Sequence, residues 1–178
     1  MKFAFFLMFF FFFEYNIFAQ NVKICWNTNK VLCWSDFRVL NSQENIDEGY
    51  SALSFCGIIL KIKYDLVIPY FDKEKSWVLL SRKKSKILLS HEITHFDIVE
   101  LFARKMRHEF DISTDKNFEP IYDRNIILLD SCQDRYDVET NHGIIESEQT
   151  CWNNYISDEL KKLDKYKTTE KECNILKD

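Results

Sequence analysis

Residues 85–106, with the sequence SKILLSHEITHFDIVELFARKM, carry the strongest structural pattern in the chain. The positions that recur there at steps of three or four residues are Leu88, His91, His95, Val99, Phe102 and Met106. Such spacing places side chains on one face of an α-helix, because the helix turns once in about 3.6 residues. Ser85 stands just before this stripe and is a residue type that caps helix N-termini. We therefore predict a long helix that begins after Ser85.

The segments before this helix have the character of β-strands. β-Branched and aromatic residues are concentrated in 51–55, 58–64 and 66–68. Gly49, Gly57 and Pro69 punctuate these runs, as turn-forming residues do. The sequence predicts a small antiparallel β-sheet in the N-terminal part of the chain.

Two further helices are expected after residue 106. They cover about 118–135 and about 144–163, and residues 136–143 are interpreted as the connection between them. The charged tail after Lys165 is expected to fray. Strands followed by helices, rather than an alternation of the two, predict an α+β fold.

Composition excludes several classes of protein. The 178 residues are enough for one domain, and the net charge of −4 argues against general nucleic-acid binding. With 46% apolar residues the chain is not intrinsically disordered. Three Gly and two Pro are too few for a turn-rich sandwich or barrel.

The first 19 residues differ from the rest of the chain. They hold nine of the 16 Phe, and 3–13 form an unbroken apolar run that follows Lys2. The run is too short to span a bilayer but has the length of a signal-peptide core. We predict cleavage between Ala19 and Gln20, which leaves residues 20–178 as a single exported domain without a membrane anchor. The destination is the periplasm, the cell surface or the medium; an uncleaved anchor is the alternative.

Six cysteines follow the predicted signal peptide, and export makes disulfides plausible for them. Two pairings have a local rationale. Cys25 and Cys33 flank a plausible hairpin turn, and Cys132 and Cys151 are expected to face each other on antiparallel helices. A CxxC motif is absent from the sequence, which argues against a cysteine-rich zinc site.

The motif His91-Glu92-Ile93-Thr94-His95 is an HExxH on the predicted helix. Histidines four residues apart lie one turn apart on the same face, so both rings can reach one Zn²⁺ ion. Glu92 is then the expected general base, which takes a proton from a metal-bound water. The alternative is an amphipathic helix with two core histidines, each of which would need buried hydrogen-bond partners.

A catalytic zinc needs a third protein ligand. His108 lies too far along the helix, and Ile98 and Leu101 stand where the pattern HExxHxxGxxH has Gly and His. His142, beside a glycine in the predicted connection, is the favoured third ligand, and Glu139 is the alternative.

Three more residues are assigned supporting roles. Tyr136 is a candidate hydrogen-bond donor to the developing oxyanion, with a packed aromatic at a helix end as the alternative. Asp97 and Gln149 are candidates for contacts that support the metal ligands. A salt bridge on the back of the helix is the alternative for Asp97.

The stretch 88–105 resembles a bacterial domain-of-unknown-function family described as predicted secreted zinc-dependent proteases. Further segments that look like the family's motifs follow one another along 33–155: Trp34-Ser35-Asp36-Phe37, Phe71-Asp72-Lys73, Ser76-Trp77, Tyr136-Asp137, Glu139-Thr140, His142-Gly143, Gln149 and Trp152. Ile93-Thr94 departs from the Gln-Gly expected inside the motif, between the ligands. The resemblance implies a zincin-like fold and a bound metal.

Taken together, the residues and the resemblance predict a secreted zinc metallopeptidase. In this prediction an N-terminal β-sheet precedes a zincin-like helical part, and the substrate is a peptide or protein. The alternative is an exported, metal-stabilised binding or adhesion protein that does not turn over a substrate. Neither interpretation predicts the oligomeric state.

Overall fold

A computed structural model describes residues 22–27, 29–41, 50–62, 65–115 and 117–176. The predicted signal peptide and its cleavage site lie outside these residues. None of the helices that the structure describes has the length and apolar character that crossing a bilayer requires.

The strands form two small sheets. In the first, β1 (Lys23–Cys25) and β4 (Cys56–Lys61) flank β5 (Leu66–Asp72), and both pairings are antiparallel. In the second, β2 (Arg38–Leu40) and β3 (Ala52–Leu53) flank β6 (Trp77–Leu79). The pairing of β2 with β6 is parallel. The prediction of one antiparallel sheet is therefore correct for the first sheet but incomplete for the whole strand region.

Four α-helices follow: α1 (Lys86–Ile112), α2 (Glu119–Thr140), α3 (Glu146–Lys162) and α4 (Glu170–Ile175). Single 3₁₀ turns cover Trp34–Asp36, Leu80–Arg82 and Asp164–Tyr166. The predicted start of α1 is confirmed, because the Ser85 side chain accepts a hydrogen bond from the backbone N–H of Leu88 at 3.2 Å. The α+β class is confirmed as well.

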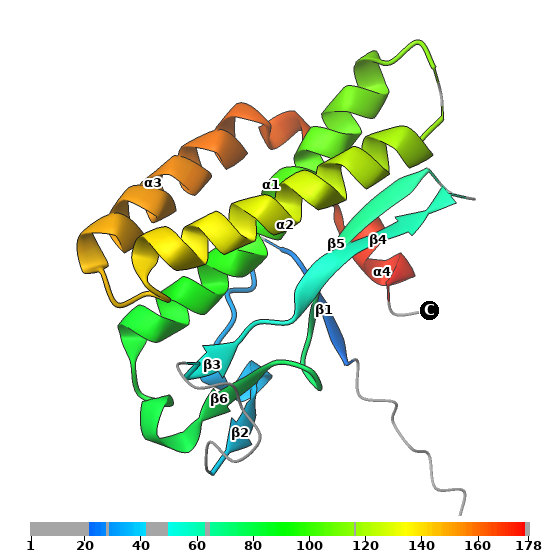
Figure 1. Ribbon diagram of the computed structural model, residues 1–178. Helices are drawn as coiled ribbons and strands as arrows, with labels where there is room; N and C mark the ends of the chain where they lie inside the picture. The colour runs from blue at the N-terminus through cyan, green and yellow to red at the C-terminus, as the bar shows by residue number, and fades with distance from the viewer. Residues whose placement is uncertain (1–21, 28, 42–49, 63–64, 116, 177–178) are drawn as a thin grey trace, which may run out of the picture.

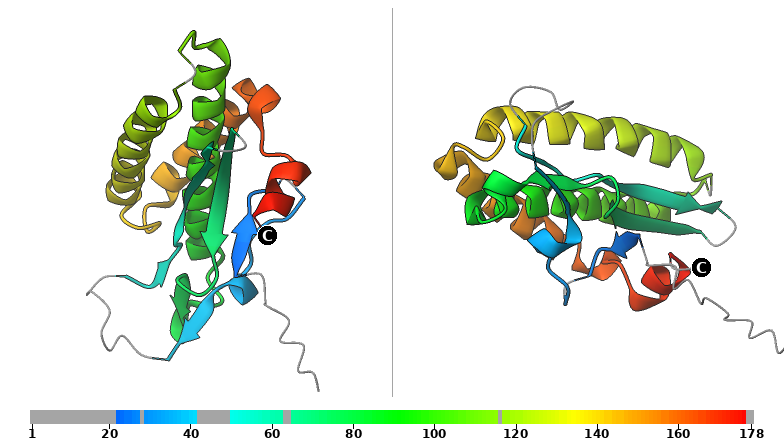
Figure 2. Two further views of the ribbon diagram at one scale, coloured as in Figure 1. Left: turned by 90° about the vertical axis from the view of Figure 1, so that its right-hand side faces the viewer. Right: turned by 90° about the horizontal axis from the view of Figure 1, so that it is seen from below.

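Helix α1 is the centre of the molecule. Figures 1 and 2 show it packed against the β4–β5 sheet and flanked by α2 and α3. It contributes fully buried side chains to both interfaces, among them Ile98, Val99, Ala103 and Met106. These buried side chains anchor the middle of the helix.

The end of α2 differs from the prediction. The helix continues through Thr140, five residues beyond the expected end, and Asn141 closes it in a left-handed conformation with φ 47°. Tyr136 and Thr140 are completely buried, so packing extends the helix past the point where the sequence pattern weakens. Most of the expected connection 136–143 is therefore helical.

Both predicted disulfide pairings are wrong. Cys25 is bonded to Cys173, which lies 148 residues away in sequence, and Cys33, Cys132 and Cys151 are free thiols. Cys132 is half-buried and Cys151 is exposed, so the two are not in a common environment.

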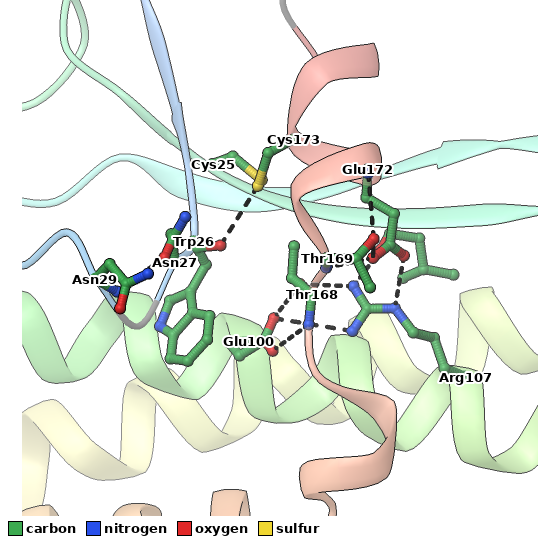
Figure 3. Close-up of a disulfide and its surroundings, with 11 residues drawn as sticks. Cys25, Trp26, Asn27, Asn29, Glu100, Arg107, Thr168, Thr169, Glu172 and Cys173 are labelled. Carbon is green, nitrogen blue, oxygen red and sulfur yellow. Dashed lines mark hydrogen bonds and ion pairs between the residues drawn. A yellow bond between two sulfur atoms is a disulfide. The ribbon is translucent and has the colours of Figure 1, made fainter.

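The C-terminal tail is held against α1 rather than frayed. Figure 3 shows the disulfide beside a cluster of charged side chains from α1 and α4. Glu100, which is fully buried, accepts hydrogen bonds from the backbone N–H and hydroxyl of Thr168 at 3.0 and 2.5 Å. Arg107 forms an ion pair with Glu172 at 3.2 Å. These contacts hold the tail on α1, and the charge of Glu172 is compensated there by Arg107.

Candidate metal centre

The two histidines of the HExxH motif point into the same cavity from α1. Their Nε2 atoms are 3.1 Å apart, and the rings meet edge to face. His91 is almost completely buried and stacks on the ring of Tyr136, with centroids 4.6 Å apart. The helical spacing that the sequence predicted therefore brings both rings to one point.

A carboxylate from α2 meets both rings. Oδ1 of Asp137 lies 3.0 Å from Nε2 of His91 and 3.0 Å from Nε2 of His95. Asp137 is in the last turn of α2, in the part of the helix that the sequence did not predict. Among the described residues, these three form the one cluster of His, Cys, Asp or Glu with the geometry to hold a metal ion.

Two glutamines contact the far side of the histidine rings. Oε1 of Gln149 on α3 lies 3.0 Å from Nδ1 of His91. Oε1 of Gln133 on α2 lies 2.6 Å from Nδ1 of His95. An amide oxygen accepts hydrogen bonds, so each Nδ1 carries its proton and each Nε2 presents a lone pair to the centre in the neutral ring.

The orientation of both amides is supported by further hydrogen bonds. The amide nitrogen of Gln133 donates to the backbone oxygen of His95 at 3.0 Å. The amide nitrogen of Gln149 donates to the Asn153 side-chain oxygen at 2.7 Å and to the Tyr136 hydroxyl. The two oxygens thus face the rings because the nitrogens are engaged elsewhere.

Three acceptor atoms consequently face one another across 3.0–3.1 Å. Lone pairs at this distance repel unless a cation lies between them. Ligand atoms about 2.0–2.1 Å from a tetrahedral zinc ion are about 3.3 Å apart. The observed triangle is close to that size, so the residues fit a metal ion.

The pKa values of Asp137 and His95 in the metal-free protein also reflect the attraction of this site for positive charge. Burial acts to raise the pKa of Asp137, but hydrogen bonds from both histidines outweigh it and hold the pKa below its usual range. Burial acts to lower the pKa of His95, but the carboxylates of Asp137 and Glu92 raise it above the ordinary value. The three groups therefore favour a positive charge between them, whether a proton or a metal ion supplies it.

Glu92 is placed to act on a group bound at this centre. Its side chain is nearly completely buried, and its Oε2 has no hydrogen-bond partner among the described residues. Burial raises the pKa of this carboxyl, and the neighbouring histidines oppose the shift. A buried carboxylate oxygen without a hydrogen-bond partner is costly, and a pKa shifted by burial is a common feature of residues that exchange protons.

A cavity of about 420 Å³ opens over these groups, which is within the size range of small-ligand pockets. Its lining includes His91, Glu92, His95 and Asp137. Strand β3 and the connection between α2 and α3 contribute to its walls.

His142, the favoured third ligand in the sequence analysis, lies beside the centre. Its Nδ1 is 3.5 Å from Oδ1 of Asp137, and its imidazole is 40% exposed and lines the cavity. Glu139, the alternative, faces away: it accepts a hydrogen bond from the indole of Trp152 at 2.8 Å and lies 3.5 Å from Arg135. The geometry favours Asp137 over both as the third ligand.

The connection that holds His142 has an unusual backbone. Asn141, His142 and Gly143 have φ angles of 47°, 52° and 78°, so three consecutive residues are left-handed. A Cβ on Gly143 would come within 2.9 Å of the Cβ of His91. Only glycine allows the connection to pack this closely on His91, a candidate metal ligand.

The supporting residues predicted from sequence have different positions. Gln149 contacts His91, as expected of a residue that supports a ligand. Tyr136 does not line the cavity: its hydroxyl donates to the backbone oxygen of His91 at 3.2 Å, so the structure gives it a packing role instead of contact with an oxyanion. Asp97 lies on another face of α1, where it accepts a hydrogen bond from the Trp26 indole at 2.7 Å instead of forming the expected salt bridge.

Sequence reasoning missed Asp137 as a ligand and missed Gln133 altogether. The two are four residues apart and therefore lie on one face of α2. This signal was present in the sequence, but it carries meaning only once 133–140 are known to be helical and to face α1.

Comparisons with known proteins give no match: no family model, no curated protein and no solved structure is similar to the chain. The geometry of the site is therefore the basis for assigning a function.

Proposed function

We propose that the protein is a zinc-dependent peptidase of the zincin type. The observation that carries the proposal is the convergence of two imidazole nitrogens and one carboxylate oxygen within 3.0–3.1 Å, beside the buried carboxyl group of Glu92. Two His and one acidic residue form a ligand set of catalytic zinc sites.

His91, His95 and Asp137 would hold the metal. When bound, zinc supplies a Lewis acid that polarises the scissile carbonyl and lowers the pKa of its water towards about 7. Gln133 and Gln149 keep the two imidazoles in the tautomer that presents Nε2.

Glu92 acts as general base and then as general acid. Its carboxylate takes a proton from the attacking water as the new C–O bond forms at the carbonyl carbon. It then gives this proton to the amine nitrogen as the peptide C–N bond breaks. A buried carboxyl with a raised pKa suits both steps, because it binds the proton more readily than an exposed one.

The disulfide supports an exported location. Structural disulfides persist in oxidising compartments and are rare in the cytosol. The Cys25–Cys173 bond is consistent with a signal peptide at residues 1–19 and with action in the periplasm, on the cell surface or in the medium.

The proposal is tested by elemental analysis and by one conservative variant. We expect one zinc ion per purified chain and degradation of an unfolded polypeptide that stops on chelation and returns with zinc. Glu92→Gln should keep the zinc and lose about a thousandfold or more in rate, since it retains shape but cannot accept a proton. A variant as active as the parent protein would exclude Glu92 as the base; zinc-free protein with the native fold would exclude the metal site.

A further inference from the structure

Apolar side chains gather at the mouth of the cavity over the metal centre. Tyr50, Leu53, Ile87 and Ile144 all line it, and they are 38%, 39%, 41% and 69% exposed. Isolated exposed apolar residues are normal on protein surfaces. Four around one concave site are informative, because contiguous apolar patches mark binding surfaces.

These side chains come from three separate parts of the chain. Tyr50 and Leu53 belong to the β3 region, Ile87 to the first turn of α1, and Ile144 to the connection between α2 and α3. Residues so far apart in sequence meet only through the tertiary fold. We call these four the apolar rim.

A run of positive charge adjoins the apolar rim. Arg82, Lys83, Lys84 and Lys86 place four cations within five residues, and all four are exposed. Arg82 itself lines the cavity. We call these four residues the basic segment.

The fold does not account for the basic segment. It stands at the N-terminus of α1, where the helix dipole disfavours positive charge. None of its four cations forms an ion pair with any residue that the structure describes. The chain as a whole is acidic, with a net charge of −4, so this concentration is local. A local concentration of unpaired positive charge that borders a cavity indicates an anionic partner.

We infer that the cavity selects peptide segments in which a large apolar residue stands next to acidic residues. The apolar side chain would be covered by the apolar rim, while the acidic residues would pair with the basic segment. Cleavage of such a segment rests on the proposed peptidase function; its binding does not. The concave shape favours a peptide over a flat anionic membrane.

The test uses quenched fluorescent peptides of equal length that differ either in the central residue or in the residues that flank it. One has a central Leu flanked by Asp and Glu, a second has Ser in place of Leu, and a third has Lys in place of the acidic residues. We expect the first to be cleaved with a kcat/KM roughly tenfold or more above the other two. The advantage over the Lys peptide should shrink with added salt, because screening weakens exposed charge pairs.

Matched variants test whether the apolar rim causes the preference for Leu and the basic segment causes the preference for acidic flanks. Ile144→Ser should remove most of the preference for Leu, whereas Ile127→Ser, on the outer face of α2 and also 69% exposed, should not. K83E/K84E should abolish or reverse the preference for acidic flanks. The control K61E/K171E makes the same change in net charge at exposed lysines outside the cavity.

Binding separates this inference from the proposed function. Fluorescence anisotropy with Glu92→Gln protein measures peptide affinity without turnover. Preferential binding of the first peptide without cleavage by the parent protein would overturn the peptidase and keep the specificity. Equal cleavage of all three peptides would overturn the specificity and keep the peptidase. Binding to anionic lipid vesicles is measured as well. If the parent protein binds them, K83E/K84E does not, and the peptide preference is unchanged, the basic segment contacts a membrane and the inference is wrong.

Discussion

Gln133 and His95 hold each other through two hydrogen bonds, although 38 residues separate them in sequence. Oε1 of Gln133 lies 2.6 Å from Nδ1 of the His95 ring, and its amide nitrogen donates to the backbone oxygen of His95 at 3.0 Å. The second bond prevents the amide from turning its nitrogen to the ring. The imidazole is thereby held in the tautomer that a metal ligand needs.

Loss of the Gln133 contact should weaken metal binding. Gln133→Leu is expected to lower zinc affinity by about 10–100-fold, because the ring loses the partner that orients it. Competition with a chromogenic chelator measures this. Ser131→Ala, an exposed change on the same helix, is the control and should bind zinc as the parent does. Equal affinities for the two variants would contradict the role of Gln133.

The identity of the third ligand can be decided by a pair of variants. Asp137→Ala should no longer retain one zinc per chain after dialysis, whereas His142→Ala should retain it. The reason is distance: Oδ1 of Asp137 lies 3.0 Å from both Nε2 atoms, whereas Nδ1 of His142 lies 3.5 Å from that same oxygen. The reverse result would restore His142 as the ligand.

Gly143 should be intolerant of a side chain. Its φ of 78° is strained for alanine, and the new Cβ would meet His91 at 2.9 Å. We expect Gly143→Ala to lower the free energy of unfolding by about 1–3 kcal/mol and to weaken zinc binding as well. Gly57→Ala is the comparison, because its nearest neighbour is the flexible Tyr70 side chain at 3.3 Å. Equal, small losses for both would show that the connection adapts.

Reduction of the disulfide should cost much of the stability. Cys25 and Cys173 close a loop of 148 residues, and cross-links over such lengths stabilise by about 3–5 kcal/mol through the entropy of the unfolded chain. The double variant Cys25→Ser/Cys173→Ser should lose this amount in guanidinium unfolding, and reductant should then have no further effect. Cys33→Ser, which removes an exposed free thiol, should leave stability unchanged.

Asp97 should make stability depend on pH in mildly acidic solution. Burial raises its pKa from 3.8 to about 6. Between these values the folded protein keeps a proton that the unfolded chain has released, so stability falls as pH rises across the window and is level above it. Asp97→Asn should therefore be more stable than the parent at pH about 7, by about 1–3 kcal/mol, and equal to it near pH 3.5.

Urea unfolding at several pH values measures this difference. A chelator should be present throughout, so that the loss of metal in acid does not contribute. A constant difference between the two proteins at all pH values would show that Asp97 does not titrate in this window.

Local features could be predicted from sequence because they depend on neighbours in the chain. The apolar stripe of α1, its Ser85 cap and the range of α3 follow from the period of the helix. The placement of His91, Glu92 and His95 on one helix required no tertiary information, since four residues make about one turn. The α+β class likewise followed from the order of strand-like and helical segments.

Contacts between distant segments could not be predicted in this way. Asp137 meets the histidines because packing against α1 extends α2 past residue 135 and points its last turn at them. Cys25 met Cys173 because the tail is drawn onto α1 by Glu100 and Arg107. The sequence thus contained two of the proposed ligands and the proposed base within one helical turn. The third ligand, the glutamines and the disulfide depended on how separate elements pack, because their free energy comes from contacts that no local pattern encodes.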